Sequence, residues 1–301
     1  MRIAIILNGI SKKKQFFLTK VYPALQREFN VTLFKTLHAS HAIQLAKQAT
    51  DEGFDLVIAA GGDGTLNQVL NGLLHSENIS RPMLGLFPLG SANDFARTIN
   101  ASSSVDRLIQ SIKELSFQAI DVGQVNCIGK NGNPIKHFFI NACSLGMGPL
   151  VVERLERNRK SLGASLSYLL SILVTFLTHK PQYVICTADD WQWKGKARVA
   201  AFSNGSSFGN GIYIAPDAVI SDGLLNSFIA EDVALPRFLV YLQTIKAKKK
   251  IVNEKIQYKT TAKVELTSLE ACALEAEGEI VGYLPATIVV KNQLIRFLKH
   301  K

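Results

Sequence analysis

Apolar residues along the first third of the chain fall into two alternating patterns. Short apolar runs predict buried strands at about residues 3–7, 31–36, 56–60 and 83–87, of which the run at 31–36 is β-branched. Between these runs, apolar residues recur every three or four positions, which predicts amphipathic helices at about residues 17–28, 42–49, 66–74 and 105–112. Gly53 is placed to end the second of these helices, and Ser102–Ser104 supply an N-cap for the last. This alternation predicts a parallel sheet covered by helices on both faces.

The pattern changes after about residue 120, where strands follow one another with few helices between them. Clusters of Gly, Asn and Asp separate strand-like runs at residues 118–125, 137–142, 182–188, 197–203, 224–229, 263–267 and 271–276. Helical spacing is found at 150–178 and at about 232–247. This half therefore predicts an antiparallel β-domain, built as a sandwich or half-barrel.

The chain as a whole is expected to be α/β plus β, with two domains. Its 301 residues are too many for one small domain, and an apolar fraction of 47% is ample for packed cores. The boundaries that we predict are 1–124 for an α/β nucleotide-binding domain and 125–289 for a β-domain. The tail at about residues 290–301 is a candidate to return to the first domain.

The balance of charge narrows the choice of partner. Lys and Arg number 34 against 24 Asp and Glu, a net charge of +10, which favours a phosphate-bearing ligand or an acidic membrane surface. Nucleic acid is disfavoured, because no basic stripe with regularly spaced aromatic residues is present. The four cysteines form no C-x-x-C pair, which argues against a zinc site and fits reduced thiols in a cytoplasmic protein.

A glycine-rich turn is the strongest local signal for chemistry. The predicted strand Leu56–Ala60 runs into Gly61-Gly62-Asp63-Gly64-Thr65, and a helix follows. Glycines let backbone N–H groups approach a phosphate closely, the helix adds its positive end, and Thr65 is placed to cap it. Asp63 would repel phosphate unless Mg²⁺ or a network of donors lies between them. A tight βα turn without a ligand remains the alternative, and the turn has no Walker lysine.

A second turn repeats this arrangement. The predicted strand 83–87 is followed by Pro88-Leu89-Gly90-Ser91-Ala92 and then by Asn93-Asp94-Phe95-Ala96-Arg97, which begins a helix. Both turns follow strands of a parallel sheet, so both are expected at its carboxyl edge, where open α/β sheets bind ligands. Arg97 is placed either to contact phosphate or to pair with a nearby carboxylate. Two such turns at one edge predict a nucleotide site.

Carboxylates near the end of the chain are candidates for the reaction itself. Glu275, Glu277 and Glu279 alternate, so on a strand they would share one face, either as catalytic groups or as a solvated acidic surface. Asp222 before Gly223 suits a turn, and its carboxylate together with backbone oxygens also suits a hard cation such as Mg²⁺.

Taken together, these motifs resemble the diacylglycerol kinase catalytic family in its compact bacterial lipid-kinase form. The stretches that carry the resemblance are Gly61–Gly72, Pro88–Arg97, Phe138–Gly146, Ser203–Gly211, Ala215–Leu225 and Glu277–Glu279 ahead of Pro285. The resemblance implies an N-terminal α/β domain similar to that of NAD kinases and phosphofructokinases, packed on a C-terminal β-sandwich with ATP in the cleft. It implies transfer of a γ-phosphate to a lipid hydroxyl, with a diacylglycerol-like acceptor.

The resemblance also assigns residues. It implies nucleotide contacts at Thr36, Gly61, Gly62, Asp63, Gly64, Thr65, Leu66, Asn67, Gly90, Ser91, Asn93 and Asp94. It implies an Mg²⁺ site at Asp222 with the backbone oxygens of Val219 and Leu224. It implies Glu279 as the general base, with Glu277 and Asp63 as further catalytic candidates. The chain departs from the family where Gln68 replaces a usual Glu and Glu277 replaces a usual Asp.

Two basic clusters predict peripheral association with an anionic membrane. Arg154, Arg157, Arg159 and Lys160 precede the apolar stretch 162–177, and Lys246 and Lys248–Lys250 form the second cluster. The expected partners are thus a lipid substrate, an anionic membrane surface and, as an open alternative, a second copy of the chain. Two other functions stay open: an NAD kinase, which shares the Gly-Gly-Asp-Gly turn, and a catalytically weak nucleotide- or lipid-binding module.

Overall fold

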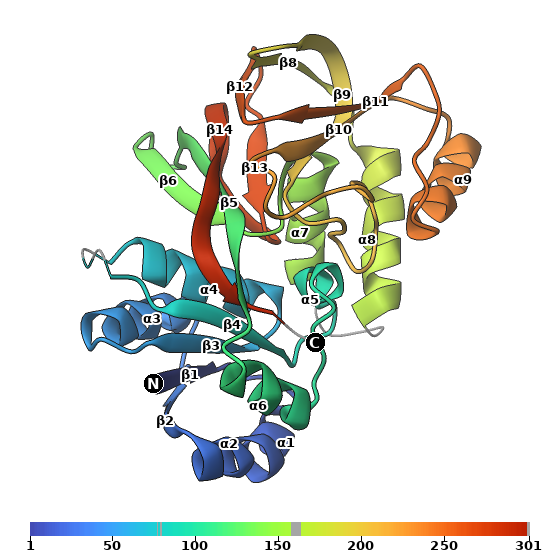
Figure 1. Ribbon diagram of the computed structural model, residues 1–301. Helices are drawn as coiled ribbons and strands as arrows, with labels where there is room; N and C mark the ends of the chain where they lie inside the picture. Colours follow the sequence, from blue (N-terminus) through green and yellow to red (C-terminus); the bar gives the residue numbers. More distant parts are fainter. Residues whose placement is uncertain (77, 79, 158–163, 300–301) are drawn as a thin grey trace. The chain divides into compact units, whose positions relative to one another are not determined.

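The computed structural model describes residues 1–76, 78, 80–157 and 164–299 (Figure 1). Predicted features that lie outside the described residues are Arg159, Lys160, Leu162 and Gly163. The chain divides into two compact units. Unit 1 comprises Met1–Ile120 and Gln293–Lys301, and unit 2 comprises Asp121–Asn292.

Unit 1 is built on a parallel sheet with the order β4-β3-β1-β2. Its strands are β1 (Arg2–Leu7), β2 (Asn30–Lys35), β3 (Leu56–Gly61) and β4 (Met83–Pro88). At the edge beside β4, Phe297 of β14 (Glu279–Leu298) pairs in parallel with Leu84. β1 and β3 are buried along nearly their whole length, as expected for strands covered on both faces.

Helices cover the two faces of this sheet. The predicted helix at 17–28 is a series of short segments, α1 (Lys14–Phe16), the π-helical turn η1 (Phe17–Val21) and α2 (Tyr22–Glu28), which packs with α6 (Val105–Lys113) on one face. The other helices of the unit are α3 (His41–Asp51), α4 (Asp63–Leu74) and α5 (Asp94–Thr98). As predicted, Gly53 follows α3 with a φ of 70°, and the Ser104 side chain caps α6 by accepting a hydrogen bond from the Arg107 N–H group.

Unit 2 is strand-rich, and six of its strands close a ring. The pairings run β7-β9-β8-β12-β14-β13 and back to β7. The strands of the unit are β5 (Phe117–Ile128), β6 (Pro134–Phe139), β7 (Ala142–Gly146), β8 (Gln182–Ala188), β9 (Gln192–Ser203), β10 (Leu225–Glu231), β11 (Ile256–Thr261), β12 (Lys263–Ser268), β13 (Ala273–Ala276) and most of β14. Buried side chains such as Phe139, Cys143, Cys186 and Phe202 form its core.

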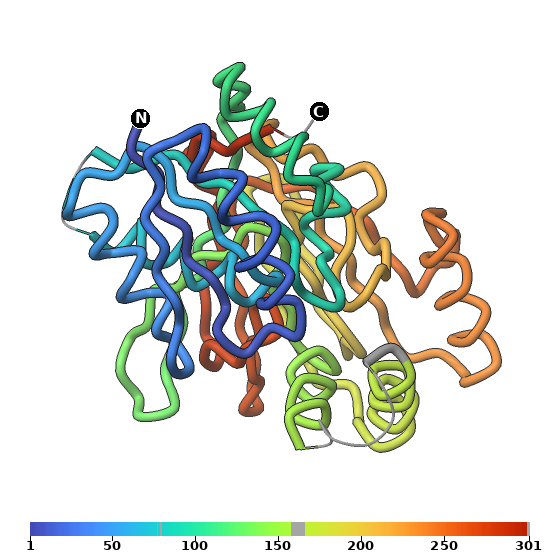
Figure 2. The backbone as a smooth tube through the Cα atoms, turned by 90° about the horizontal axis from the view of Figure 1, so that it is seen from below, coloured from blue at the N-terminus to red at the C-terminus, as the bar shows by residue number. Residues whose placement is uncertain are grey.

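A second core of unit 2 lies under three helices. The predicted helical region at 150–178 contains two described helices, α7 (Met147–Arg157) and α8 (Ala164–Thr178), which lie side by side (Figures 1 and 2). With α9 (Leu235–Lys246), they bury apolar side chains against β9 and β10. Across the described residues, no helix is both long and apolar enough to cross a membrane.

The strand predictions for unit 2 need four corrections. The strand expected at 137–142 is interrupted, because β6 ends at Phe139 and β7 begins at Ala142. β11 was not predicted at all, and neither was the 20-residue strand β14, whose alternation is broken by Pro285 and by polar residues near Asn292. The strand expected at 271–276 is shorter, since β13 comprises Ala273–Ala276, and the chain turns at Glu277 and Gly278 before β14 begins.

Candidate active site

The first glycine-rich turn joins β3 directly to α4. β3 ends at Gly61, Gly62 is the N-cap residue and α4 begins at Asp63. The Leu66 N–H group makes the first helical hydrogen bond, to the Gly62 carbonyl at 3.0 Å, so the N–H groups of Gly64 and Thr65 precede the helical ladder. Such groups at the positive end of a helix are suited to bind an anion.

Thr65 does not cap the helix, contrary to the prediction. It is the third residue of α4, and its hydroxyl accepts a hydrogen bond from Asn8 Nδ2 at 3.0 Å. Asn8 follows β1, so this contact joins the ends of two neighbouring strands. Thr36 acts similarly after β2, because its Oγ1 atom accepts a hydrogen bond from the Gly9 N–H group at 2.9 Å. The ends of β1, β2 and β3 are therefore linked by threonine hydroxyls.

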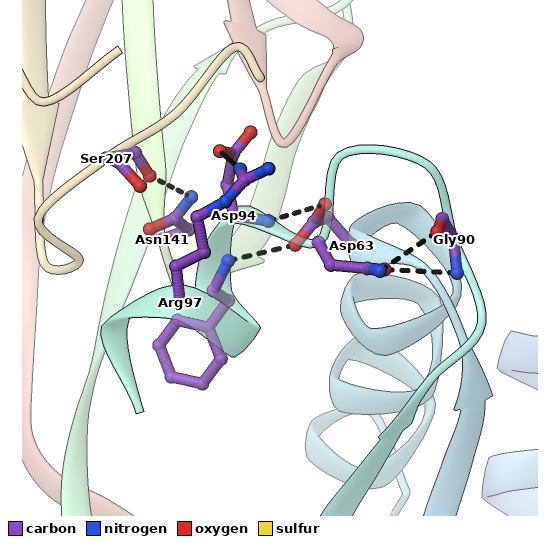
Figure 3. A network of polar contacts seen from close by, with 8 residues as sticks. Asp63, Gly90, Asp94, Arg97, Asn141 and Ser207 are labelled. Carbon is purple, nitrogen blue, oxygen red and sulfur yellow. Dashed lines mark hydrogen bonds and ion pairs between the residues drawn. The ribbon is translucent and has the colours of Figure 1, made fainter. Parts of the chain in front are cut away.

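Asp63 links the two glycine-rich turns (Figure 3). Its carboxylate accepts hydrogen bonds from the backbone N–H groups of Asp94 and Phe95, each at 3.0 Å. Burial raises the pKa of Asp63, and the two N–H groups partly offset this rise. An acid in this turn was expected to need either Mg²⁺ or a network of hydrogen-bond donors. The two N–H groups that donate to Asp63 support the network of donors.

The second turn is held by its own asparagine. Asn93 Oδ1 accepts a hydrogen bond from the Gly90 N–H group at 3.0 Å, and Asn93 Nδ2 donates to the Gly90 carbonyl at 2.9 Å (Figure 3). Arg97 Nη1 lies 2.6 Å from Asp94 Oδ1, so Arg97 pairs with a carboxylate of the same turn. A Cβ atom on Gly90 would lie 2.5 Å from the Gly62 Cα atom, which shows that the two turns are in direct backbone contact.

Gly64 stands apart from the other glycines of these turns. Apart from its chain neighbours and the backbone of α4 itself, a Cβ atom added there would meet no described atom within 4 Å, and its φ is not in the left-handed region. Neither packing nor backbone conformation within the described chain requires glycine at this position. Leu66 and Asn67, in contrast, are buried in the unit, and Asn67 Oδ1 accepts a hydrogen bond from Asn71 at 3.1 Å. Ser91 is exposed at the second turn.

The three glutamates of unit 2 do not share a strand face. β13 ends at Ala276, Glu277 and Gly278 have φ values of 56° and 81°, and β14 begins at Glu279. The turn directs the carboxylates to different surroundings, because left-handed residues break the alternation of a strand. The prediction of one acidic face was therefore wrong.

Two of these carboxylates are bound by the protein itself. Glu277 Oε1 accepts the N–H groups of Ile140 at 2.9 Å and Asn141 at 2.5 Å, in the break between β6 and β7. Glu275 is buried, and it accepts the Ser144 hydroxyl at 2.5 Å and the Gly278 N–H group at 3.0 Å. Burial raises the pKa of Glu275 to about 7. Glu279, at the start of β14, is exposed.

The predicted metal ligands lie in a loop that is tied to β5. Asp121 is fully buried and accepts the Gly223 N–H group at 2.7 Å, while its own N–H group donates to the Ile220 carbonyl at 2.7 Å. Asp222 Oδ1 accepts the Leu224 N–H group at 3.0 Å and the side chain is exposed. The described residues contain no group of three His, Cys, Asp or Glu that could hold a metal, so a cation here would need backbone oxygens as well. One carboxylate with carbonyl oxygens is a donor set that suits Mg²⁺.

Two buried asparagines, Asn141 and Asn204, were not predicted as functional residues from the sequence. Asn204 Nδ2 donates to the carbonyls of Asp121 and Ile140, both at 2.9 Å, and Asn141 Nδ2 donates to the Ser207 carbonyl at 2.8 Å (Figure 3). These contacts hold the break between β6 and β7 to which Glu277 also binds. Both asparagines lie in stretches that resemble the family, and this resemblance was the sequence signal that could have identified them.

A cavity of about 300 Å³ lies elsewhere in unit 2. Its lining includes Trp191, Lys250, Tyr258 and Lys259, and none of the predicted site residues lines it. Lys250 pairs there with Asp217, so this member of the second basic cluster has a carboxylate partner. The cavity is thus not the site that the motifs predict.

Comparison with known proteins agrees with the motifs over nearly the whole chain. Residues 2–125 match the diacylglycerol kinase catalytic domain, and residues 141–299 match the YegS C-terminal NAD kinase beta sandwich-like domain. Among curated proteins, the "Probable lipid kinase YegS-like" of Enterobacter sp. (strain 638) is 30% identical over 79% of this chain and 77% of its own. That of Cronobacter sakazakii is 30% identical over 87% of this chain and 86% of its own.

Solved structures show the same fold. A diacylglycerol kinase of Bacillus anthracis strain Sterne superimposes with a TM-score of 0.74 at 19% identity, covering 99% of this chain and 97% of that one. Yeast NADH kinase complexed with NADH superimposes with a TM-score of 0.53 at 10% identity, covering 100% of this chain and 84% of that one, which is a likeness of fold alone. The two matched domains and the identity to curated relatives lead to one conclusion: the chain belongs to the YegS-like lipid kinase family and is a kinase with a diacylglycerol kinase catalytic domain.

Proposed function

We propose that the chain transfers the γ-phosphate of ATP to the hydroxyl group of a diacylglycerol-like lipid. The open space beside Gly64 is the observation that best supports ATP binding. Gly64 lies in the first turn of the 12-residue helix α4, and a side chain there would enter open space. A glycine that the protein does not itself need is explained by a ligand that must approach the backbone, and a phosphate chain is the ligand that a helix N-terminus favours.

The other proposed nucleotide contacts also belong to unit 1. The N–H groups of Gly64 and Thr65 and the turn at Gly90–Asp94 are proposed to bind the phosphates, with Thr36 and Ser91 as further contacts. Asp63 is proposed to act by positioning, because its carboxylate already binds the N–H groups of Asp94 and Phe95. Without a Walker lysine, the phosphate charge would be balanced by backbone amides, by a metal ion or by an arginine from elsewhere in the chain.

A structural Mg²⁺ ion is proposed to be held by the Asp222 carboxylate with the backbone oxygens of Val219 and Leu224, a set of oxygen donors that suits this cation. Asp121 holds this loop in place by binding the Gly223 N–H group at 2.7 Å. The proposed phosphate-binding turns belong to unit 1, and the carboxylates proposed for metal binding and proton transfer belong to unit 2.

Glu279 is proposed as the general base. Glu279 is exposed to solvent at the start of β14, where an acceptor hydroxyl can approach its carboxylate. Its carboxylate takes the proton of the acceptor hydroxyl as the oxygen bonds to the γ-phosphorus. The bond from that phosphorus to the β–γ bridging oxygen breaks, and ADP leaves with the electron pair.

One experiment tests these assignments. The protein is incubated with Mg²⁺, γ-labelled ATP and a panel of diacylglycerol, monoacylglycerol, phosphatidylglycerol, ceramide, sphingoid base and NAD. Label in diacylglycerol that falls roughly 10²- to 10⁴-fold in Glu279→Gln supports the proposal. The matched control is Glu254→Gln, which alters an exposed glutamate of unit 2. Label that appears in NAD, or a Glu279→Gln variant as active as the control, would contradict it.

A further inference from the structure

Helix α8 is unusual for a helix at a protein surface. Its 15 residues, Ala164–Thr178, include no charged side chain. At 1.5 Å per residue the helix is about 22 Å long, shorter than the roughly 30 Å of a bilayer's hydrocarbon core. It therefore has the composition of a membrane helix without the length to cross one.

One side of α8 packs against the core of unit 2. Ile172 and Phe176 are buried in the cluster that α8 shares with α7 and α9, and Ser171 and Thr175 are buried beside them. Phe176 stacks on Phe238 of α9, with ring centroids 4.0 Å apart. The inner side thus has ample apolar contact, and it needs no further partner.

The other side of α8 exposes large aliphatic residues. Leu166, Leu170, Val174 and Leu177 are 49%, 39%, 41% and 66% exposed, and we call these four side chains the outer face. At about 100° per residue they lie within an arc of roughly 80°, opposite Ile172 and Phe176. Single exposed leucines are common on soluble proteins, but a continuous row of four is not, and such a row indicates an interaction surface.

We propose that the outer face of α8 is the element by which the protein docks on an anionic bilayer, lying parallel to the surface. The inference rests on the proposed function, because the substrate of a lipid kinase resides in the bilayer. Side chains of this kind enter the boundary between headgroups and acyl chains, about 5–10 Å deep. The inner face would stay packed on unit 2, so α8 would anchor the protein without being inserted across the membrane.

Charge near the helix favours an anionic surface over a neutral one. Arg154 Nη2 donates to Thr178 Oγ1 at 2.8 Å, which places a guanidinium at the C-terminal end of α8. Lys180, which is exposed, follows α8 two residues after its last residue Thr178. Basic residues near an apolar anchor add attraction to anionic headgroups.

A second copy of the chain is a poorer partner for this face. A strip about 22 Å long and about 10 Å wide covers roughly 220 Å², whereas a stable dimer interface buries about 800 Å² on each partner. A two-fold contact would also bring the same arginine and lysine residues of both copies close together, at a net charge of +10 each.

The test is flotation of the full-length protein with vesicles of phosphatidylcholine containing phosphatidylglycerol. We expect Leu170→Ser and Val174→Ser each to lower the partition coefficient roughly tenfold, and the double variant about 100-fold. The matched controls are Val252→Ser and Leu269→Ser, which remove aliphatic side chains that are 98% and 93% exposed elsewhere in unit 2. These controls should bind vesicles like the unaltered protein.

Kinase activity separates failure of this inference from failure of the proposed function. With a water-soluble short-chain diacylglycerol, the α8 double variant should phosphorylate as fast as the unaltered protein, while the rate on vesicle diacylglycerol falls. Equal flotation of the α8 variants and the controls would overturn the docking inference. A second result would also overturn the docking inference. Light scattering without lipid would find the mass of a dimer for the unaltered protein and the mass of a monomer for the α8 variants. Loss of label from every lipid would instead overturn the proposed function and leave the flotation result standing.

Discussion

The carboxylate of Asp63 and the backbone N–H group of Asp94 are hydrogen-bonded at 3.0 Å, although 31 residues separate them in the chain. The same carboxylate binds the Phe95 N–H group. No side chain of the second turn caps α5, since its N-cap residue Asn93 makes no such bond. Asp63 therefore caps a helix in the neighbouring turn, and it fixes the distance between the two segments that are proposed to bind phosphate.

Replacing Asp63 should loosen both turns. We expect Asp63→Ala to lower the free energy of unfolding by about 2–4 kcal/mol, because two buried N–H groups lose their acceptor. Asp63→Asn keeps one acceptor oxygen and should cost about half as much. Urea denaturation measures both. The matched control is Asp106→Ala, which removes an exposed carboxylate from the first turn of α6 and should cost under about 1 kcal/mol. Equal stability of Asp63→Ala and this control would refute the role.

Two glycine substitutions should separate packing from ligand binding. Gly90→Ala places a Cβ atom 2.5 Å from the Gly62 Cα atom, so we expect a loss of stability of about 1–3 kcal/mol and weaker ATP binding. Gly64→Ala meets open space within a helix, so the unliganded protein should gain about 0.5–1 kcal/mol.

The same Gly64→Ala protein should bind ATP at least tenfold more weakly, since the methyl group occupies the space proposed for phosphate. Thermal shift with and without Mg²⁺ and ATP measures both effects. A Gly64→Ala variant that binds ATP normally would remove the main support for the nucleotide site.

Glu277 should matter for the architecture of unit 2. Glu277→Ala leaves the N–H groups of Ile140 and Asn141 without their carboxylate, and we expect the free energy of unfolding to fall by about 2–4 kcal/mol. The free energy of unfolding of Glu277→Asp should lie between the values for the unaltered protein and Glu277→Ala. Its carboxylate is retained, but the side chain is shorter by roughly one C–C bond, about 1.5 Å. Glu270→Ala, at an exposed glutamate ahead of β13, is the control and should be near neutral. Denaturant titration that finds Glu277→Ala as stable as Glu270→Ala would disprove the contact's importance.

Glu275 should make stability depend on pH. Its pKa is raised to about 7 in the folded protein from an ordinary value of 4.5. Between these values the folded state holds a proton that the unfolded state has lost, so stability falls as pH rises from about 4.5 to about 7. The fall attributable to this group is on the order of 3 kcal/mol, and it levels off above the folded pKa.

Glu275→Gln isolates this contribution. Its amide oxygen can accept the Gly278 N–H group while its amide nitrogen donates to the Ser144 hydroxyl, so both contacts have a counterpart. The difference in unfolding free energy between the unaltered protein and Glu275→Gln should therefore shift in favour of the variant as pH rises from 4.5 to 7. A difference that stays constant across this range would show that Glu275 does not titrate there.

Much of unit 1 could be predicted because local pattern and tertiary packing agree. β1, β3 and β4 are apolar along nearly their whole length, and Gly53 and Ser104 end and begin helices as their chemistry requires. The contact between Asp63 and the Asp94 N–H group could not be predicted, because sequence spacing does not reveal which backbone donors a carboxylate faces. The sequence left two explanations for an acid at Asp63, a metal ion or a network of hydrogen-bond donors. The hydrogen bonds of Asp63 support the network of donors.

Unit 2 was harder to predict because its key contacts are made at breaks in strands. Alternation of Glu275, Glu277 and Glu279 suggested one face, but left-handed backbone at Glu277 and Gly278 sends the carboxylates apart. Glu277 has no local signal for this conformation, since glutamate rarely adopts it. β14 was missed because its pattern of apolar residues is irregular over 20 residues, and its partners are set by tertiary structure.

The pairing of Phe297 with Leu84 has a consequence for how the protein is made. The strand that covers the outer edge of β4 lies 213 residues further along the chain, the difference between positions 297 and 84. At about 5–20 residues per second, a ribosome needs roughly 10–40 s to add that length. During this time β4 presents an uncovered apolar edge, which is a template for mispairing with other chains. Nascent unit 1 should therefore depend on chaperones until the returning strand arrives, and yield in cells should respond to translation speed between these two segments.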